Sequence, residues 1–372
     1  MANMMDYIDW RGDIPFSQVP LNEVDNLVLS AICYVDFEDV IPSPLNKTVP
    51  LRWAVRSYLR RHRGEKAYLG AILPKQIIAL AVKAAKSVRF GNLRVCGYVN
   101  HVSDDRQMQF SAMTYMLDDN TLFVAYRGTD DTIIGWKEDL NMSFMHPVPA
   151  QLEAVSYLDD VARERKENIY VGGHSKGGNL AVYALAKATP ETKERVLGAF
   201  NNDGPGFNRE FIESLDYETS REKIRTFLPE SSIVGILLEH EEKYEVVKSS
   251  VNGVWQHDSL SWEVLGSSFI HLDDITEDSK SVDKTVKAWL ERMSAEDREI
   301  FVDNIFNALA STQAKTLTDL NKDRKKIRQA WGNLDSETKN AIYKYAKLLF
   351  KERTKNIIPY KEKLPPAKKA KP

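Results

Sequence analysis

Short apolar stretches and segments of helical periodicity alternate along most of the chain. Three extended stretches stand at residues 92–102, 106–117 and 121–129, with turn residues at 118–120 between the last two. An amphipathic segment at 151–165 then predicts a helix. This alternation predicts an α/β fold, in which a mostly parallel sheet is covered by helices on both faces.

Two further helices are predicted nearer the N-terminus. Leu21 to Val35 has apolar residues at helical spacing. Leu73 to Val88 has the same spacing, with Pro74 near its start and Gly91 just past its end, as is typical of helix boundaries.

The stretch GHSKGG at 173–178 stands between two predicted elements. Asn168 to Val171 is β-branched and aromatic and predicts a buried strand, and Asn179 to Lys187 predicts a helix with an apolar body. A strand, one tight turn and a helix form the context of a nucleophile elbow. The flanking glycines leave room where a strained backbone would bring Cβ atoms too close. This context predicts that Ser175 is a nucleophile.

The composition changes near residue 275, after which only helical patterns follow. Ser294 with Asp297 forms a capping box at the start of one of these helices. We therefore expect a sheet-containing domain at 1–275 and a helical segment at 276–350. A basic tail at 351–372 is too polar and proline-rich to fold alone. The alternative for this tail is a weak contact with a membrane surface.

Composition and charge are typical of a globular protein and give no indication of nucleic-acid binding or a membrane span. The 372 residues are 43% hydrophobic and 28% charged with a formal net charge of −2, so a core can form and no global charge favours nucleic acid. Cys33 and Cys96 stand in apolar surroundings and predict buried thiols in a reducing compartment. No basic region followed by an apolar stretch opens the chain, and no uncharged apolar run approaches the ~18 residues of a membrane span. We expect a cytoplasmic protein.

Motifs for other chemistries are absent from the sequence. There is no C-x-x-C, H-E-x-x-H or GxxxxGK[ST], so neither a metal nor another cofactor is expected. The basic segments lack the interleaved aromatic residues of nucleic-acid-binding modules, so no nucleic-acid partner is expected. The oligomeric state is left open.

A serine nucleophile needs a histidine base, and three histidines follow the turn. His257 lies in VWQHDSLSW, a polar segment with turn residues that suits a base carried on a loop. His240 is surrounded by carboxylates, which favours a surface position, and His271 lies farther along the chain. His174, inside the elbow, would point the wrong way. His257 is therefore the predicted base.

Several separated motifs resemble those of the class 3 lipases. TLFVAYRGTDDTIIGWKEDL at 121–140 and VGGHSKGGNLAVYAL at 171–185 resemble the lipase strand ending in Arg-Gly-Ser/Thr, the Trp and Asp-Leu after it, and the elbow. QHDSLSW at 256–262 is similar to the segment around the lipase catalytic histidine. The opening, YIDWRGDIPFSQVPLNEVDNLVLSAICYVDFE, resembles the bacterial Mbeg-like family of unassigned function. The resemblance covers roughly residues 1–270 and implies an α/β-hydrolase fold and hydrolysis of an acyl ester.

Carried over by residue, the resemblance implies Ser175 as nucleophile and His257 as base. Thr129, in YRGT, would supply a backbone N–H and its hydroxyl to the oxyanion hole, and Lys176 would supply a second N–H. The lipases usually have leucine where Lys176 stands, so its side chain either recognises a carboxylate or phosphate on the substrate or reaches solvent. Trp136 and Asp139 are interpreted as packing and loop-anchoring residues.

The acid departs from the lipase pattern, which would place it where this chain has Ser232. Asp203, after the strand that follows the elbow helix, is the predicted replacement, because its asparagine and glycine neighbours control the backbone there. Glu230, at the end of the next strand, is the alternative acid. An Asx turn that holds the loop together is the non-catalytic interpretation of Asp203.

Together these residues predict a serine hydrolase that cleaves an acyl ester of a lipid or small amphiphile through an acyl-enzyme. An acyltransferase or a thioesterase would use the same triad, and the sequence does not separate them. The alternative from another class is a catalytically weak or inactive lipase-like scaffold that serves for binding, because the lipase aspartate is replaced.

Overall fold

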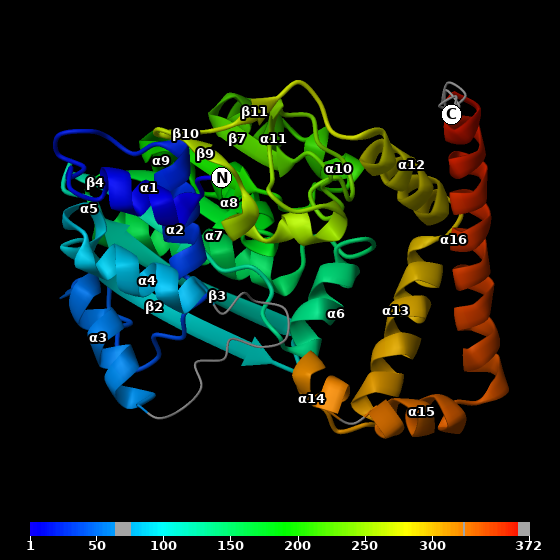
Figure 1. The fold of residues 1–372 in the computed structure, drawn as a ribbon. Coiled ribbons are helices and arrows are strands. Elements are labelled where there is room, and N and C mark those ends of the chain that lie inside the picture. The colour runs from blue at the N-terminus through cyan, green and yellow to red at the C-terminus, as the bar shows by residue number, and fades with distance from the viewer. Residues whose placement is uncertain (64–75, 323, 364–372) are drawn as a thin grey trace, which may run out of the picture.

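The computed structural model describes residues 1–63, 76–322 and 324–363 (Figure 1). Its centre is a nine-stranded sheet in the order β1-β2-β3-β4-β5-β6-β7-β8-β11. The strands are β1 (Val49–Pro50), β2 (Arg94–Ser103), β3 (Met108–Met116), β4 (Thr121–Tyr126), β5 (Asn168–His174), β6 (Val196–Asn202), β7 (Ile224–Pro229), β8 (Tyr244–Val247) and β11 (His271–Leu272). Two short strands, β9 (Val264–Leu265) and β10 (Ser268–Phe269), pair apart from this sheet.

The direction of the strands divides the sheet into a parallel part and two antiparallel edges. Strands β4 to β8 pair parallel. Strands β1 to β4, and β8 with β11, pair antiparallel. The predicted α/β fold is therefore present. Since the carboxyl ends of β4 to β8 meet at one edge, loops after these strands come together there.

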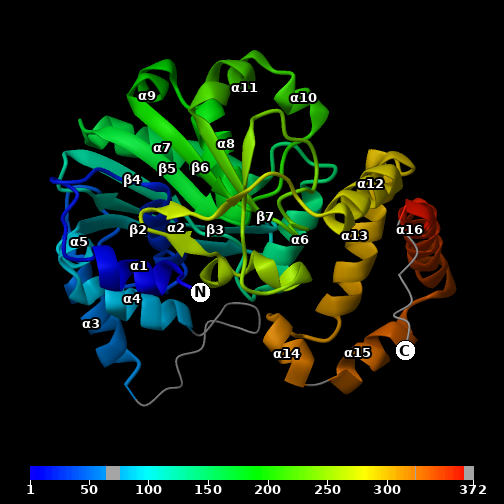
Figure 2. The same cartoon turned by 45° about the horizontal axis from the view of Figure 1, so that its top comes forward.

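Helices cover both faces of the sheet (Figure 2). On one face α2 (Glu23–Ile32) and α4 (Gln76–Lys86) bury their apolar residues, and on the other α7 (Pro149–Glu164) and α8 (Lys176–Lys187) do so. The remaining short elements of this part are α1 (Met4–Arg11), α3 (Leu51–Arg61), α5 (Val88–Gly91), α6 (Ile133–Asn141), α9 (Pro190–Arg195), α10 (Arg209–Ile212), α11 (Leu215–Ser220), η1 (Arg221–Lys223), η2 (Gly253–His257) and η3 (Ser259–Ser261). Each face thus has its own apolar core.

The predicted helices near the N-terminus correspond to observed ones. The pattern at 21–35 matches α2, and the pattern at 73–88 matches α4 and the start of α5, with residues 73–75 outside the described part of the chain. Cys33 and Cys96 are buried free thiols, as predicted. None of the described helices combines the length and apolar character needed to cross a bilayer.

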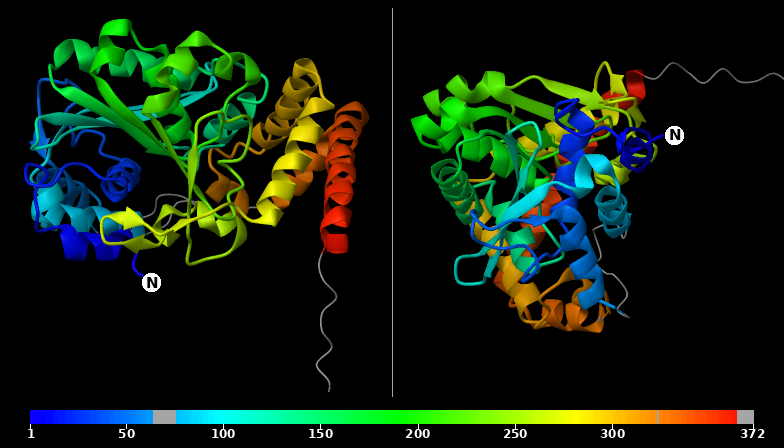
Figure 3. Two further views of the ribbon diagram at one scale, coloured as in Figure 1. Left: turned by 90° about the horizontal axis from the view of Figure 1, so that it is seen from above. Right: turned by 90° about the vertical axis from the view of Figure 1, so that its left-hand side faces the viewer.

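The C-terminal helices stand beside the sheet, next to α6 (Figures 1 and 3). They are α12 (Glu277–Glu291), α13 (Ala295–Ala310), α14 (Leu317–Lys322), α15 (Arg324–Asn333) and α16 (Ser336–Lys363). The predicted capping box opens α13, where Ser294 Oγ accepts from the Asp297 N–H at 3.0 Å. Residues 351–363 continue α16, where the sequence predicted a tail without regular structure, and residues 364–372 lie outside the described part.

Candidate active site

Ser175 occupies the tight turn between β5 and α8. Its backbone has φ 57° and ψ −135°, a conformation that residues other than glycine rarely adopt. A Cβ on Gly173 would lie 2.2 Å from the Gly177 carbonyl carbon, and a Cβ on Gly177 would lie 2.1 Å from the Tyr126 carbonyl oxygen. Only glycine fits at these two positions, so the sequence GHSKGG folds into the predicted strand, turn and helix.

Asp203 and His257 meet beside this turn. Asp203 directly follows β6, and its side chain is fully buried. Its Oδ2 accepts a hydrogen bond of 2.6 Å from Nδ1 of His257, which ends η2. Glu230, the alternative acid, instead accepts a long bond of 3.5 Å from Gln256 Nε2. Of the two candidate acids, Asp203 is the one bonded to the histidine.

Uncharged donors hold the second oxygen of Asp203. Its Oδ1 accepts from Ser232 Oγ at 2.5 Å and from the Gly235 N–H at 3.1 Å. A buried carboxylate is stable only when its oxygens are satisfied in this way. Ser232, at the position where the lipase resemblance would place an aspartate, therefore donates instead to Asp203, which follows the neighbouring strand.

His174, which the sequence predicts to point the wrong way for a base, lies against the His257 ring. Its ring centroid is 4.7 Å from that of His257, and its Nε2 is 2.8 Å from the His257 carbonyl oxygen. Burial, and next the electrostatic interaction with the neighbouring His257 ring, lower the pKa of His174 to about 3. Because the carbonyl only accepts, the hydrogen of the neutral ring is on Nε2, and Tyr34 donates to Nδ1 at 3.1 Å. His174 therefore holds the backbone of His257 in place. In the sequence, the only indication of this role is that His174 directly precedes Ser175.

The predicted oxyanion residues adjoin Ser175. Thr129 follows Gly128, where a Cβ would lie 3.0 Å from the Ser175 Cβ and 2.1 Å from the Tyr34 hydroxyl, so this backbone passes close to the nucleophile. Lys176 is the first residue of α8, and a helix leaves its first N–H groups without an internal partner. Both backbone segments can therefore offer N–H groups at the turn.

The hydroxyl of Thr129 is bonded to Asp139. Thr129 Oγ1 lies 2.6 Å from Asp139 Oδ2 and 2.8 Å from Oδ1. Burial raises the pKa of Asp139 to about 6, while the charge of Lys176 opposes that rise. An ionised carboxylate only accepts, so Asp139 takes the single hydroxyl hydrogen of Thr129. The prediction that this hydroxyl donates to the oxyanion is therefore wrong, and only the backbone N–H of Thr129 is left for that role. Asp139 anchors the loop, in agreement with the sequence interpretation.

The side chain of Lys176 differs from both predictions made for it, because it neither reaches solvent nor faces a substrate. It is 1% exposed, and its Nζ lies 3.0 Å from Glu138 Oε2 and 3.8 Å from Asp139 Oδ1. Gln109 accepts two further bonds from it, each 2.9 Å long. Glu138 is itself fully buried and also accepts from the Ala150 N–H at 2.8 Å. Lys176 is thus the cation of a cluster of charges next to Ser175.

The two other candidate histidines lie elsewhere. His240 Nδ1 is 2.9 Å from Glu242, and His271 Nε2 is 2.9 Å from Glu23. His271, Glu23 and Glu245 offer atoms close enough together for a metal ion. However, Arg225 Nη2 already lies 3.0 Å from Glu23 and 2.9 Å from Glu245, so a cation occupies the space between these carboxylates.

The groups that would react are not engaged by other side chains. Within the described ranges, neither the Ser175 hydroxyl nor His257 Nε2 has a hydrogen-bond partner. Contacts between a catalytic serine and its base are often long before substrate binds. The arrangement can therefore support attack by the serine on a carbonyl carbon.

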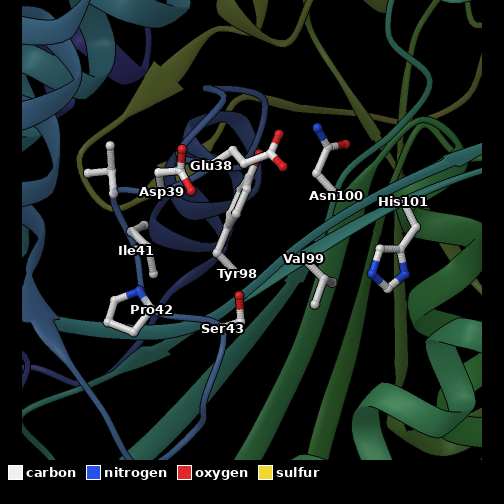
Figure 4. Close-up of a pocket in the computed structure, with 10 residues that line it drawn as sticks. Glu38, Asp39, Ile41, Pro42, Ser43, Tyr98, Val99, Asn100 and His101 are labelled. Atoms are coloured by element: carbon white, nitrogen blue, oxygen red, sulfur yellow. The ribbon is translucent and has the colours of Figure 1, made fainter.

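A cavity of about 440 Å³ lies elsewhere, between the loop after α2 and strand β2 (Figure 4). Residues 38–43 and 98–101 line it, including the carboxylates of Glu38 and Asp39. Neither Ser175 nor His257 lines this cavity, so it is separate from the candidate active site.

The chain belongs to the Mbeg1-like family, whose model matches residues 84–307, more than half of the chain. This match confirms the family resemblance seen in the sequence. It extends past residue 275 into α13, so the family region includes the first C-terminal helices. No curated protein matched the chain.

Solved structures with a partial likeness include two lipases and one further chain. A Rhizomucor miehei lipase propeptide complex is 17% identical with a TM-score of 0.36, covering 61% of this chain and 67% of that one. M37 lipase is 14% identical with a TM-score of 0.34, covering 56% and 68%. A mutant form of MDLA from Penicillium cyclopium is 12% identical with a TM-score of 0.36, covering 66% and 83%. None of these likenesses bears on the function.

Proposed function

We propose that this protein is a serine hydrolase of α/β-hydrolase type that cleaves an acyl ester through an acyl-enzyme. The observation that carries the proposal is the 2.6 Å contact between Asp203 Oδ2 and His257 Nδ1 beside the strained elbow serine. An aspartate at Nδ1 fixes the tautomer in which Nε2 is free to accept the proton of Ser175.

The first half of the reaction acylates the serine. Ser175 Oγ attacks the carbonyl carbon, its proton passes to His257 Nε2, and negative charge collects on the carbonyl oxygen. The backbone N–H groups of Thr129 and Lys176 stabilise that charge. The bond to the alcohol oxygen then breaks, and the alcohol leaves with the proton from Nε2.

The second half releases the acid. Water attacks the acyl carbon and gives a proton to His257 Nε2, and collapse of the intermediate returns that proton to Ser175 Oγ. Thioester cleavage, or acyl transfer to an alcohol in place of water, would use the same residues. Val254 and Trp255, just before the base, are 53% and 75% exposed and favour an acyl group of a lipid or small amphiphile as the substrate.

The binding-scaffold alternative receives less support than hydrolysis. Its main argument is the missing lipase aspartate, and the bond from His257 Nδ1 to Asp203 weakens that argument. We further propose a cytoplasmic location, which the two buried free thiols support. Contact of the basic tail with a membrane surface is a separate proposal.

The test is intact-protein mass after treatment with a fluorophosphonate. Wild type should gain one adduct, whereas Ser175→Ala should gain none and His257→Ala should react far more slowly. A panel of acyl esters of increasing chain length would then define the substrate. A folded wild-type protein that gains no adduct would refute the proposal and favour the binding scaffold.

A further inference from the structure

Helix α6 lies between the candidate active site and the C-terminal helices (Figures 1 and 2). Its inner side faces the site, where Asp139 binds the Thr129 hydroxyl and Glu138 pairs with Lys176. The loop that joins Thr129 to α6 is short, so any force that moves α6 also moves the oxyanion backbone.

Backbone hydrogen bonds join this loop to the turn before α14. The Ile133 N–H donates to the Lys315 carbonyl at 2.9 Å, and the Leu317 N–H donates to the Asp131 carbonyl at 2.9 Å. Between them, Thr132 and Thr316 form an antiparallel bridge. The loop after Thr129 is therefore paired, like a strand, with residues of the C-terminal helical segment.

Apolar and charged side chains extend this contact along α6. Ile133 packs in a buried cluster with Val302 and Phe306 of α13 and with Leu320. Lys137 Nζ lies 2.7 Å from Asp303 Oδ1 on the same face of the contact. Backbone pairing, apolar burial and an ion pair thus all act on α6 from the side opposite the site.

We infer that α13, the turn before α14 and the start of α14 position the oxyanion loop, so the C-terminal helical segment is a structural part of the active site. The expected effect on the reactivity of Ser175 rests on the proposed function. The expected effect on the position of the loop after Thr129 does not. Val302, Phe306, Asp303 and Leu320 act through α6 and are positioning residues. They hold Thr129 at the distance from Ser175 that charge stabilisation requires.

The test compares two equal truncations on one helix. Phe306→Ala removes a ring that faces α6, whereas Phe301→Ala removes a ring of α13 that packs on Trp289 and Tyr345 instead. Hydrogen exchange of residues 127–141 and the rate of fluorophosphonate labelling of Ser175 are measured in both full-length variants. We expect Phe306→Ala to speed exchange at the Ile133 amide and to slow labelling at least about tenfold. Phe301→Ala should leave both near wild type.

Asp131→Ala serves if Phe306→Ala fails to fold, since it removes the 3.2 Å bond from the Thr318 N–H to the Asp131 side chain and leaves the apolar cluster intact. It should give the same two changes at a smaller size. Unchanged exchange at 127–141, or faster exchange with unchanged labelling, would overturn the inference. If wild type itself gains no adduct, the proposed function fails, while the exchange result still decides whether the C-terminal segment holds the loop.

Discussion

The acid–base side and the oxyanion side of the candidate site are held by different kinds of contact. On the acid–base side one buried carboxylate, Asp203, receives its bonds from a hydroxyl, a backbone N–H and His257. On the oxyanion side two carboxylates, Glu138 and Asp139, share the single ammonium of Lys176. Hydrogen-bond donors set the first arrangement, and ion pairs around the buried ammonium of Lys176 set the second.

This difference predicts that substitutions on the two sides have different effects. A carboxylate with uncharged donors can become an amide without stranding another charge, so a change there should alter the chemistry and spare the fold. Removing one member of a buried ion pair leaves its partner desolvated and unpaired, which costs far more stability. Loss of a hydrogen-bonding group on the acid–base side should therefore act mainly on rate, and loss of a charge on the oxyanion side should act mainly on stability and its pH dependence.

The largest effect is expected for Asp203→Asn. The amide no longer fixes the tautomer of His257, so kcat/KM for an acyl ester should fall about 10³- to 10⁴-fold, as when a triad aspartate becomes asparagine. Initial rates measure the fall, and urea unfolding should show a midpoint close to that of wild type. Glu230→Gln, the same change at the other candidate acid, should keep wild-type rates. Equal losses in both variants would contradict the assignment of Asp203.

Lys176→Met should have the largest effect on stability. It removes the cation beside Glu138, which is fully buried, and should lower the free energy of unfolding by about 3–5 kcal/mol. Urea unfolding measures this loss. The double variant Lys176→Met/Glu138→Gln removes both charges and should recover most of it. A single variant as stable as wild type would show that Lys176 does not stabilise the fold through its charge.

The fold could be predicted from local patterns because most of its elements are short and strongly patterned. The strand, turn and helix around Ser175 follow from glycines that no other residue could replace at this spacing. The docking of the C-terminal helices on α6 could not be predicted. Their apolar positions show that they bury a face, but periodicity does not say against which surface.

The site was predictable where it depends on chain order and not where it depends on packing. The contact between the predicted acid and the predicted base is present, since both follow parallel strands whose ends meet at one edge. The surroundings of Lys176 were not predictable, because Glu138 is 38 residues earlier and only the packing of α6 brings them together. The role of His174 was not predictable, because its side chain bonds to the backbone of His257 and only packing brings the two together.

Asp139 should make stability depend on pH. Its pKa is about 6 in the folded protein against 3.8 as the ordinary value, so between these pH values the folded state binds an additional proton. Its favourable contribution is complete below pH 3.8 and is lost as the pH rises through 6. Relative to Asp139→Asn, wild type should lose about 2–3 kcal/mol between about pH 4 and pH 7. Urea unfolding of both proteins across this range measures the difference, and parallel curves would show that folding does not shift the pKa of Asp139.

The smallest effect is expected for Ser232→Ala, on the acid–base side. It removes one of the two donors to Asp203 Oδ1, while the Gly235 N–H at 3.1 Å stays in place. Because the carboxylate keeps that donor and His257, we expect kcat/KM to fall only about fivefold, or ~1 kcal/mol. Ser231→Ala, a neighbour whose hydroxyl contacts Thr276 at 3.4 Å and not Asp203, is the matched control. A fall in kcat/KM as large as that of Asp203→Asn would mean that the Ser232 hydroxyl alone sets the position of the acid. The other two donors to Asp203 would then not be sufficient to hold it.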